Sequence, residues 1–230
     1  MTTDTGSRPL FDALDEVRDP ELDEPITKLG FVASASLSDD GDAVVHLRLP
    51  TYFCAPNFAY LMVADAYDAV STVEAVHRVE VVLDEHFAAD AINEGVAARA
   101  GFVGSFQGEA VDELDTLREN FLRKAVLAGT DQVCRPLVDA GATPAELAAL
   151  TLGRVPPSPA LARLRRRRAE LSLPAGDDAT LLIEPGSGDP VDAPAVPLHL
   201  RKARLTRTSL DANTGICRGM LRHRYGVEDT

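Results

Sequence analysis

The sequence predicts an α+β fold: a small N-terminal α/β sandwich, then a mainly α-helical region that ends in a short β segment and a basic helical tail. Apolar and polar residues alternate in segments 31–37, 43–49 and 79–83, as they do in half-buried strands. Apolar residues at helical spacing precede the first segment and separate the last two. The order helix, strand, strand, helix, strand is typical of a sheet with helices on one side.

The first predicted helix has an apolar face made by Leu10, Phe11, Leu14 and Val17. It should end at Asp19, because Pro20 disfavours helical backbone angles in the residue before it. The Asp19-Pro20-Glu21 segment is then expected to form a rigid turn.

The two following strands are predicted to form a hairpin. Residues 39–42 contain an Asp-Gly pair, which supplies the positive backbone angles of a tight turn. In the second strand, Val45, Leu47 and Leu49 share one face, and Pro50 ends the strand because proline cannot donate to a sheet ladder. Asn57 is the expected cap of the next helix, which leads to a third strand at 79–83.

The remainder of the chain is predicted to be mainly helical. Expected helices cover 88–100 (closed by Gly101), 111–128 (ending near Gly129), 144–152 after a capping box at Thr143, a segment starting at Ser158-Pro159, and 214–225. Short strands are expected around 181–183 and 198–205. We therefore expect segments 9–86, 87–172 and 173–230 as the main parts of the chain.

The net charge of −13 argues against a protein that binds nucleic acid over its whole surface, because it repels phosphate. The charge is uneven: an arginine run within 163–168 and the tail are basic, so they are expected to attract an acidic partner or the acidic N-terminal part. A run of charges such as 163–168 is usually a solvated helix face. No membrane span or secretory signal is apparent, and we expect a cytoplasmic protein.

Three cysteines without a C-x-x-C pair do not resemble a disulfide framework or a preformed cluster site. Cys54 lies between a strand and the start of a helix, where the helix dipole stabilises a thiolate. The alternative for Cys54 is a small buried apolar side chain, and Cys134 is expected to be packed in a core. Cys217 is expected either to anchor the tail helix or to join Cys54 as a metal ligand.

Several separately spaced segments resemble a known family. They are Val17-Arg18-Asp19-Pro20-Glu21, Leu29-Gly30-Phe31-Val32 and Leu49-Pro50-Thr51-Tyr52-Phe53-Cys54, followed by an amphipathic helix and a Val-rich strand. Residues of about 9–86 thereby resemble the MIP-eighteen type iron-sulfur cluster assembly domain, which SufT and PaaD carry. In the family pattern the cysteine is followed directly by proline, whereas here Ala55 separates Cys54 from Pro56.

The resemblance implies a maturation factor rather than a turnover enzyme. Its implied cargo is a transient iron-sulfur cluster or iron, and its implied partners are the assembly machinery and a client apo-metalloprotein such as an oxygenase subunit. Cys54 would be the transient ligand, bridging a homodimer or joined by Cys217 or by an acidic neighbour such as Asp19. Thr51 would steady its thiolate, and Asp19 would shape or share the site.

Two other classes compete with this interpretation. In the first, Cys54 is inert and the protein is an assembly chaperone or interaction module. The second is a degenerate recombinase-like DNA-binding protein, because residues 141–150 and 221–224 are loosely similar to segments of tyrosine recombinases. A helix start and a basic helix also explain both of these segments.

Overall fold

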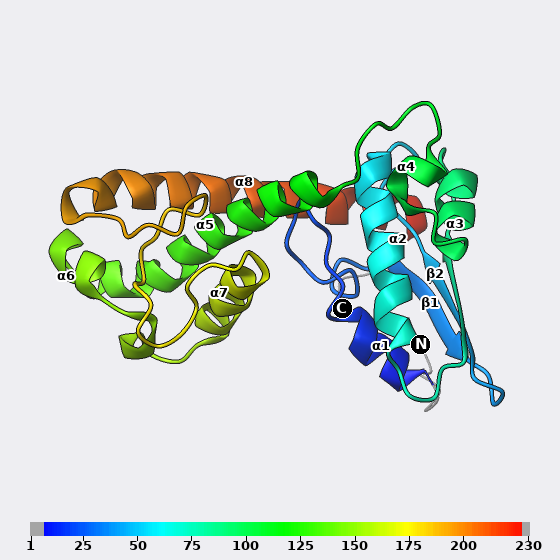
Figure 1. Cartoon of the computed structure of the whole chain (residues 1–230), viewed down its shortest axis with the longest axis horizontal. Coiled ribbons are helices and arrows are strands. Elements are labelled where there is room, and N and C mark those ends of the chain that lie inside the picture. Colours follow the sequence, from blue (N-terminus) through cyan, green and yellow to red (C-terminus); the bar gives the residue numbers. More distant parts are fainter. Residues whose placement is uncertain (1–6, 227–230) are drawn as a thin grey trace. The chain divides into compact units, whose positions relative to one another are not determined.

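The computed structural model describes residues 7–226 and divides the chain into two compact units (Figure 1). Of the described residues, unit 1 contains 7–115 and 213–226, and unit 2 contains 116–212. These bounds differ from the three segments expected from the sequence, because the end of the C-terminal helix belongs to the same unit as the N-terminal domain.

Unit 1 contains a three-stranded sheet with the order β1-β2-β3, which confirms the predicted α+β fold. Strands β1 (Val32–Leu37) and β2 (Asp42–Leu47) pair antiparallel through a turn in which Gly41 has a φ of +82°. Strand β3 (Arg78–Leu83) pairs parallel with β2. A parallel pair needs a crossover connection, and helix α2 (Pro56–Ser71) provides it.

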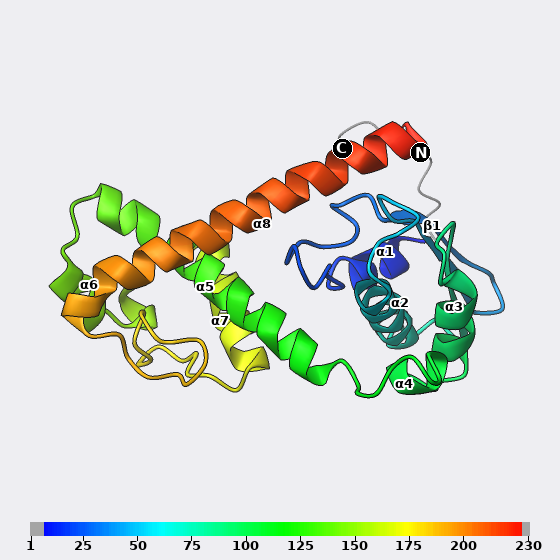
Figure 2. The same cartoon turned by 90° about the horizontal axis from the view of Figure 1, so that it is seen from above.

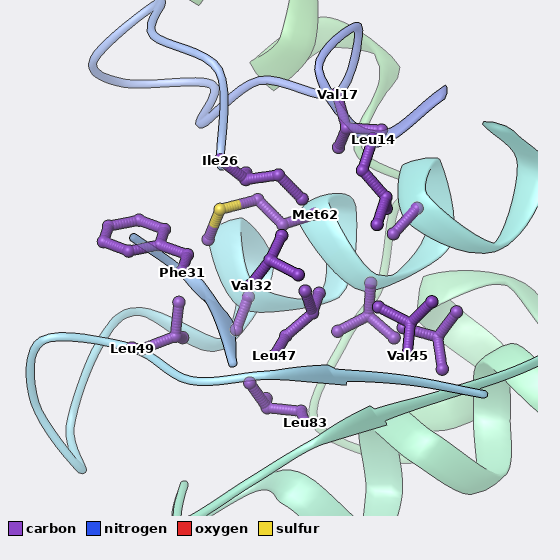
Figure 3. Close-up of a cluster of buried hydrophobic side chains, with 14 of the residues drawn as sticks. Leu14, Val17, Ile26, Phe31, Val32, Val45, Leu47, Leu49, Met62 and Leu83 are labelled. Carbon is purple, nitrogen blue, oxygen red and sulfur yellow. The ribbon is translucent and has the colours of Figure 1, made fainter. Parts of the chain in front are cut away.

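Helix α2 packs on β3 and contacts both α1 (Arg8–Leu14) and α3 (Ala89–Ala97), so the strands and helices enclose one core (Figures 1 and 2). Figure 3 shows Val45 and Leu47 of β2 facing Met62 of α2 across this core. Leu49 is buried on the same side as these strand residues, as the alternation predicted.

Several helix ends in unit 1 differ from the sequence prediction. Helix α1 ends at Leu14, not Asp19, because the N–H groups of Glu16 and Val17 donate to carbonyls three residues back instead of four. The cap of α2 is Ala55, not Asn57, because Pro56 fills the first helical position, where its fixed φ suits a helix start. Gly101 does not close a helix but begins α4 (Gly101–Ser105).

Unit 2 is built on α5 (Asp115–Asp139), which continues through the predicted end near Gly129. Gly129 lies inside α5 beside Leu164 of α7 (Pro159–Glu170), where a Cβ would make an ordinary contact at 3.5 Å, so this glycine does not end the helix. Cys134 is buried in the core of unit 2, as predicted. Thr143 forms the predicted capping box with Glu146 and starts α6 (Pro144–Ala149).

The predicted C-terminal strand and short helix are wrong, because 198–205 and 214–225 both belong to the single helix α8 (Val196–Tyr225). Two single-turn 3-10 helices, η1 (Leu152–Arg154) and η2 (Ala193–Ala195), complete the elements of unit 2. Residues 181–183 are buried, but the bridges Thr151↔Thr180 and Ile183↔Pro190 are isolated and form no strand.

The arginine run is only partly a solvated face. Arg167 and Arg168 are buried, and Arg168 is fully inaccessible. Arg168 donates to the carbonyls of Thr180, at 2.9 Å, and Leu181. It therefore gives hydrogen-bond donors to two backbone carbonyls that no strand pairs.

Among the described residues, none of the helices combines the length and apolarity needed to span a bilayer.

Candidate functional site

Cys54 lies in the loop that joins β2 to α2, one residue before the helix cap Ala55. Its side chain is half-buried, so it is neither sealed in the core nor fully exposed. The Thr51 hydroxyl lies 3.4 Å from the Cys54 Sγ and also accepts the Phe53 N–H at 3.3 Å. Sequence reasoning paired Thr51 with Cys54, and the structure brings the two side chains together.

His86 holds the backbone of Cys54 and was given no role from the sequence. Its Nε2 donates to the Cys54 carbonyl at 2.7 Å, and its Nδ1 accepts the Ala88 N–H at 3.2 Å. Burial lowers the pKa of His86, the Cys54 bond opposes this, and the nearby Arg224 lowers it further. The neutral ring with its proton on Nε2 is therefore the form that fits both partners.

The position of His86 shortly after a predicted strand could have indicated that it lies near Cys54. The register Leu47↔Leu83 aligns the carboxyl ends of the parallel strands β2 and β3. Residues shortly after each strand therefore lie at the same edge of the sheet, which is where Cys54 and His86 occur.

Asp19 is buried in the turn after α1, where its Oδ1 accepts the N–H groups of Glu21 and Leu22 at 2.9 and 2.8 Å. Burial raises the pKa of this carboxyl to about 6, although both hydrogen bonds act in the opposite direction. The charge of Glu21 raises the pKa further. Asp19 is thus a carboxylate in a place that disfavours its negative charge.

Cys217, on the part of α8 that belongs to unit 1, is close to the other predicted site residues. Burial raises the pKa of its thiol to about 11, and the charges of Asp19, Cys54 and Glu21 raise it further. Cys54 and Cys217 both pack against the core of unit 1, and the Asn213–Glu21 hydrogen bond holds this part of α8 against the turn that contains Asp19. Burial disfavours any charge here, whereas the nearby carboxylates would favour a bound cation.

These residues alone do not form a complete metal site. Within residues 7–226, no group of three or more His, Cys, Asp or Glu side chains is arranged to hold a metal ion. Any iron bound at Cys54 and Cys217 would need further ligands from sulfide or from another molecule.

The family model described as iron-sulfur cluster assembly protein matches residues 9–81, which include Asp19, Thr51 and Cys54. These residues form an iron-sulfur cluster assembly domain. The match confirms the family resemblance, covers less than half of the chain and supports a role in iron-sulfur cluster assembly. No curated protein and no solved structure matches the chain significantly.

The end of α8 packs against this assembly domain through both apolar and polar contacts. Leu221 is 2% exposed and joins the core of unit 1, while Asn213 donates to Glu21 at 3.4 Å. Arg224 donates to the carbonyl and the carboxylate of Glu85, each at 2.9 Å. The tail helix, residues 213–225 of α8, therefore carries Cys217 on a segment held at both ends.

Three exposed aromatic residues lie near Cys54: Tyr52 and Phe53 directly precede it, and Phe87 follows His86, which bonds the Cys54 carbonyl. Tyr52, Phe53 and Phe87 are 45%, 77% and 50% exposed, and their rings lie 5.0 to 6.4 Å apart. Contiguous exposed apolar surface is typical of protein contacts. We call these three residues the aromatic patch; sequence reasoning missed it, although two of its members directly precede Cys54.

Replacing Asp19 by asparagine should stabilise the protein at pH 7.5 by about 2–3 kcal/mol, from a pKa difference of roughly two units. Because the folded-state pKa is raised, the carboxyl contributes to folding stability in its protonated form. This contribution is fully present below pH 3.8 and is lost as the pH rises through about 6. Asparagine keeps the oxygen that accepts both amides and removes the charge. Urea unfolding of parent and variant at pH 4 and pH 7.5 measures this difference.

Asp12→Asn is the matched control, since Asp12 is exposed on α1. Its effect should stay within about 0.5 kcal/mol at both pH values. A loss of stability in Asp19→Asn at pH 7.5 would contradict a disfavoured carboxylate.

Proposed function

We propose that the protein is a maturation factor that receives an iron-sulfur cluster or iron and passes it to a client metalloprotein. It is not a turnover enzyme in this proposal. The observation that carries the proposal is that two free, half-buried thiols, Cys54 and Cys217, pack against the core of one unit, whose residues 9–81 match the iron-sulfur assembly family.

Thiolates are the preferred protein ligands of iron-sulfur clusters, and a stable cluster usually has four of them. Two thiols from this chain leave coordination positions for a donor or acceptor protein. Such a cargo is held weakly enough to be transferred by ligand exchange, in which thiolates of the client replace Cys54 and Cys217.

Protons move with the cargo in this proposal. Cys217, with its pKa raised to about 11, is a thiol at neutral pH and must lose its proton to bind iron. An arriving cation compensates the negative charge of Asp19 and stabilises a Cys217 thiolate, so it favours this deprotonation. The Thr51 hydroxyl, 3.4 Å from the Cys54 sulfur, is positioned to donate to a Cys54 thiolate.

The aromatic patch supports a partner that approaches Cys54 directly. We propose an apo-metalloprotein client at this surface, with an iron-dependent oxygenase component as the client class, and the iron-sulfur assembly machinery as the donor. A second copy of the chain, contributing its own Cys54, is the alternative source of ligands. The cytoplasm is the proposed compartment, because reducing conditions there keep the thiols available.

The aromatic patch also favours a second candidate function. An assembly chaperone would hold its client through Tyr52, Phe53 and Phe87, and Cys54 would be inert. The two functions differ in whether the thiol is required.

Anaerobic reconstitution with ferrous iron and sulfide, followed by visible absorption and iron analysis, tests the proposal. The parent should bind iron and absorb in the visible range. Cys54→Ser should lose most of the bound iron and of the visible absorbance, and in Cys217→Ser both should be several-fold lower than in the parent. Cys134→Ala is the control, because Cys134 is buried in the core of unit 2 and should not affect loading. A colourless parent, or equal loading of parent and Cys54→Ser, would contradict cluster carriage.

A further inference from the structure

A groove between α5 and α8 in unit 2 lies outside the site described above. It has a volume of about 310 Å³ and includes Val138 from α5 and Pro197 and Leu200 from α8. Arginines from both helices also line it, Arg135 on α5 and Arg201 and Arg204 on α8. We propose that this groove binds an acidic amphipathic segment of a partner protein.

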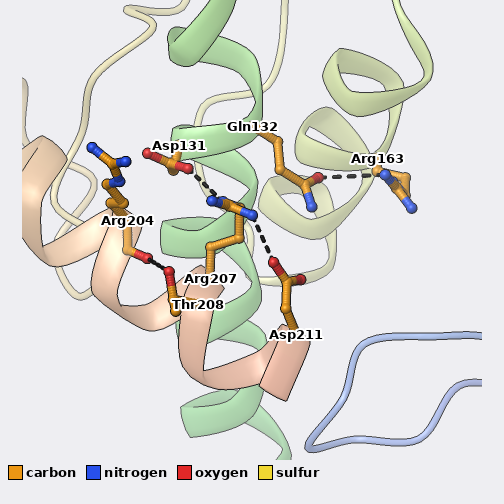
Figure 4. A network of polar contacts seen from close by, with 7 residues as sticks. All are labelled: Asp131, Gln132, Arg163, Arg204, Arg207, Thr208 and Asp211. Carbon is orange, nitrogen blue, oxygen red and sulfur yellow. Dashed lines mark hydrogen bonds and ion pairs between the residues drawn. The ribbon is translucent and has the colours of Figure 1, made fainter. Parts of the chain in front are cut away.

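Three arginines of the groove have no salt-bridge partner among the residues that the structure describes. Arg135, Arg201 and Arg204 form no salt bridge with any residue in the described range 7–226. Arg207, one turn further along α8, contrasts with them: it lies 2.5 Å from Asp131 and 2.6 Å from Asp211 (Figure 4). The neighbouring arginines are thus available to an external anion.

Carboxylates in the groove do not cancel this charge. Its lining has two of them, Asp131 and Asp139, and Asp131 is already bound by Arg207 (Figure 4). Arg201 and Arg204 are three residues apart on one helix, where like charges repel each other. A bound carboxylate relieves this repulsion, and guanidinium groups match its two oxygens.

The apolar part of the groove determines which kind of anion fits. Val138 is 44% exposed there, beside Pro197 and Leu200. Small apolar side chains of a partner would cover these residues while its Glu or Asp residues reach the arginines, as in helix-in-groove recognition. A nucleic acid offers phosphates but repels the net charge of −13 and the carboxylate of Asp139.

The partner is therefore an acidic segment with apolar residues at helical spacing. The small size of the groove predicts a weak and salt-sensitive contact, in keeping with a partner that is captured and released.

Fluorescence anisotropy of the full chain with a labelled peptide of Glu and Leu at helical spacing tests this proposal. The parent should bind the peptide, and Arg201→Glu should weaken binding about tenfold, which corresponds to about 1.4 kcal/mol. Lys202→Glu is the matched control: it makes the same charge change at the adjacent exposed position, which does not line the groove. It should weaken binding by less than about threefold, as expected for a general charge effect.

Binding of the parent should fall at high salt, and a peptide with Lys in place of Glu should not bind. Circular dichroism checks that each variant keeps its helices. The proposal is overturned by no binding to the parent, by equal losses in Arg201→Glu and Lys202→Glu, or by tighter Arg201-dependent binding of a single-stranded oligonucleotide. A parent dimer that Arg201→Glu dissociates would also overturn it, since a second copy would then occupy the groove.

Discussion

Replacing Leu221 by alanine is expected to destabilise unit 1 by about 3 kcal/mol, the usual cost of removing a fully buried leucine side chain. Leu221 is 2% exposed and belongs to the same core as residues from both strands and helices of the assembly domain. A Cβ at Gly30 would lie 3.0 Å from its Cδ2, so the tail helix fits closely against the turn before β1. Denaturant unfolding, with hydrogen exchange of residues 213–225, measures the loss.

The same substitution should change the accessibility of both site thiols. Loosening of the tail helix moves Cys217 away from Cys54, so both should react several-fold faster with Ellman's reagent. Leu205→Ala, at a position of α8 that is 72% exposed, should leave stability and thiol reactivity unchanged. Parent-like exchange and thiol reactivity in Leu221→Ala would exclude the tail helix as an integral part of the site.

Replacing Arg168 by methionine should destabilise unit 2 by about 2–4 kcal/mol, because buried carbonyls left without donors each cost about 1–3 kcal/mol. The arginine donates to Thr180 and Leu181, and the Leu181 residue is fully buried. Burial lowers the pKa of Arg168 to about 10, so removing a buried charge offsets part of the loss. Chemical denaturation followed by helix content measures the effect.

Arg166→Met is the matched comparison on the same helix, at an exposed position. It should change stability much less than Arg168→Met. Equal effects of the two substitutions would mean that the Arg168 hydrogen bonds contribute little to holding residues 180–181.

Local patterns predicted the assembly domain well. The alternation of Val45, Leu47 and Leu49 and the turn at Gly41 can be recognised from short segments of sequence, and both are confirmed. Helix ends were less predictable, since the end of α1 depends on the hydrogen bonds of Glu16 and Val17 rather than on Pro20 alone.

Unit 2 and the tail depend more on distant contacts. Residues 198–205 alternate enough to resemble a strand, yet Ala203 and Leu221 are buried in different units along one continuous helix. The buried Arg168 resembles its solvated neighbours in sequence, and only the position of residues 180–181 identifies its role.

The candidate site was predictable only where its residues lie in segments that resemble the family. Cys54, Thr51 and Asp19 lie in segments that resemble the family, so the sequence indicated them. The proximity of Cys217 depends on how the far end of the chain packs, which no spacing in the sequence encodes.

Transfer of a cluster from the reconstituted protein to an apo-ferredoxin, followed anaerobically by circular dichroism, tests the role of Cys54 most directly. The parent and Cys134→Ala should both convert the acceptor to its cluster-bound form, and Cys54→Ser should leave it apo. Transfer by Cys54→Ser at the parent rate would contradict a cargo-binding role for this thiol.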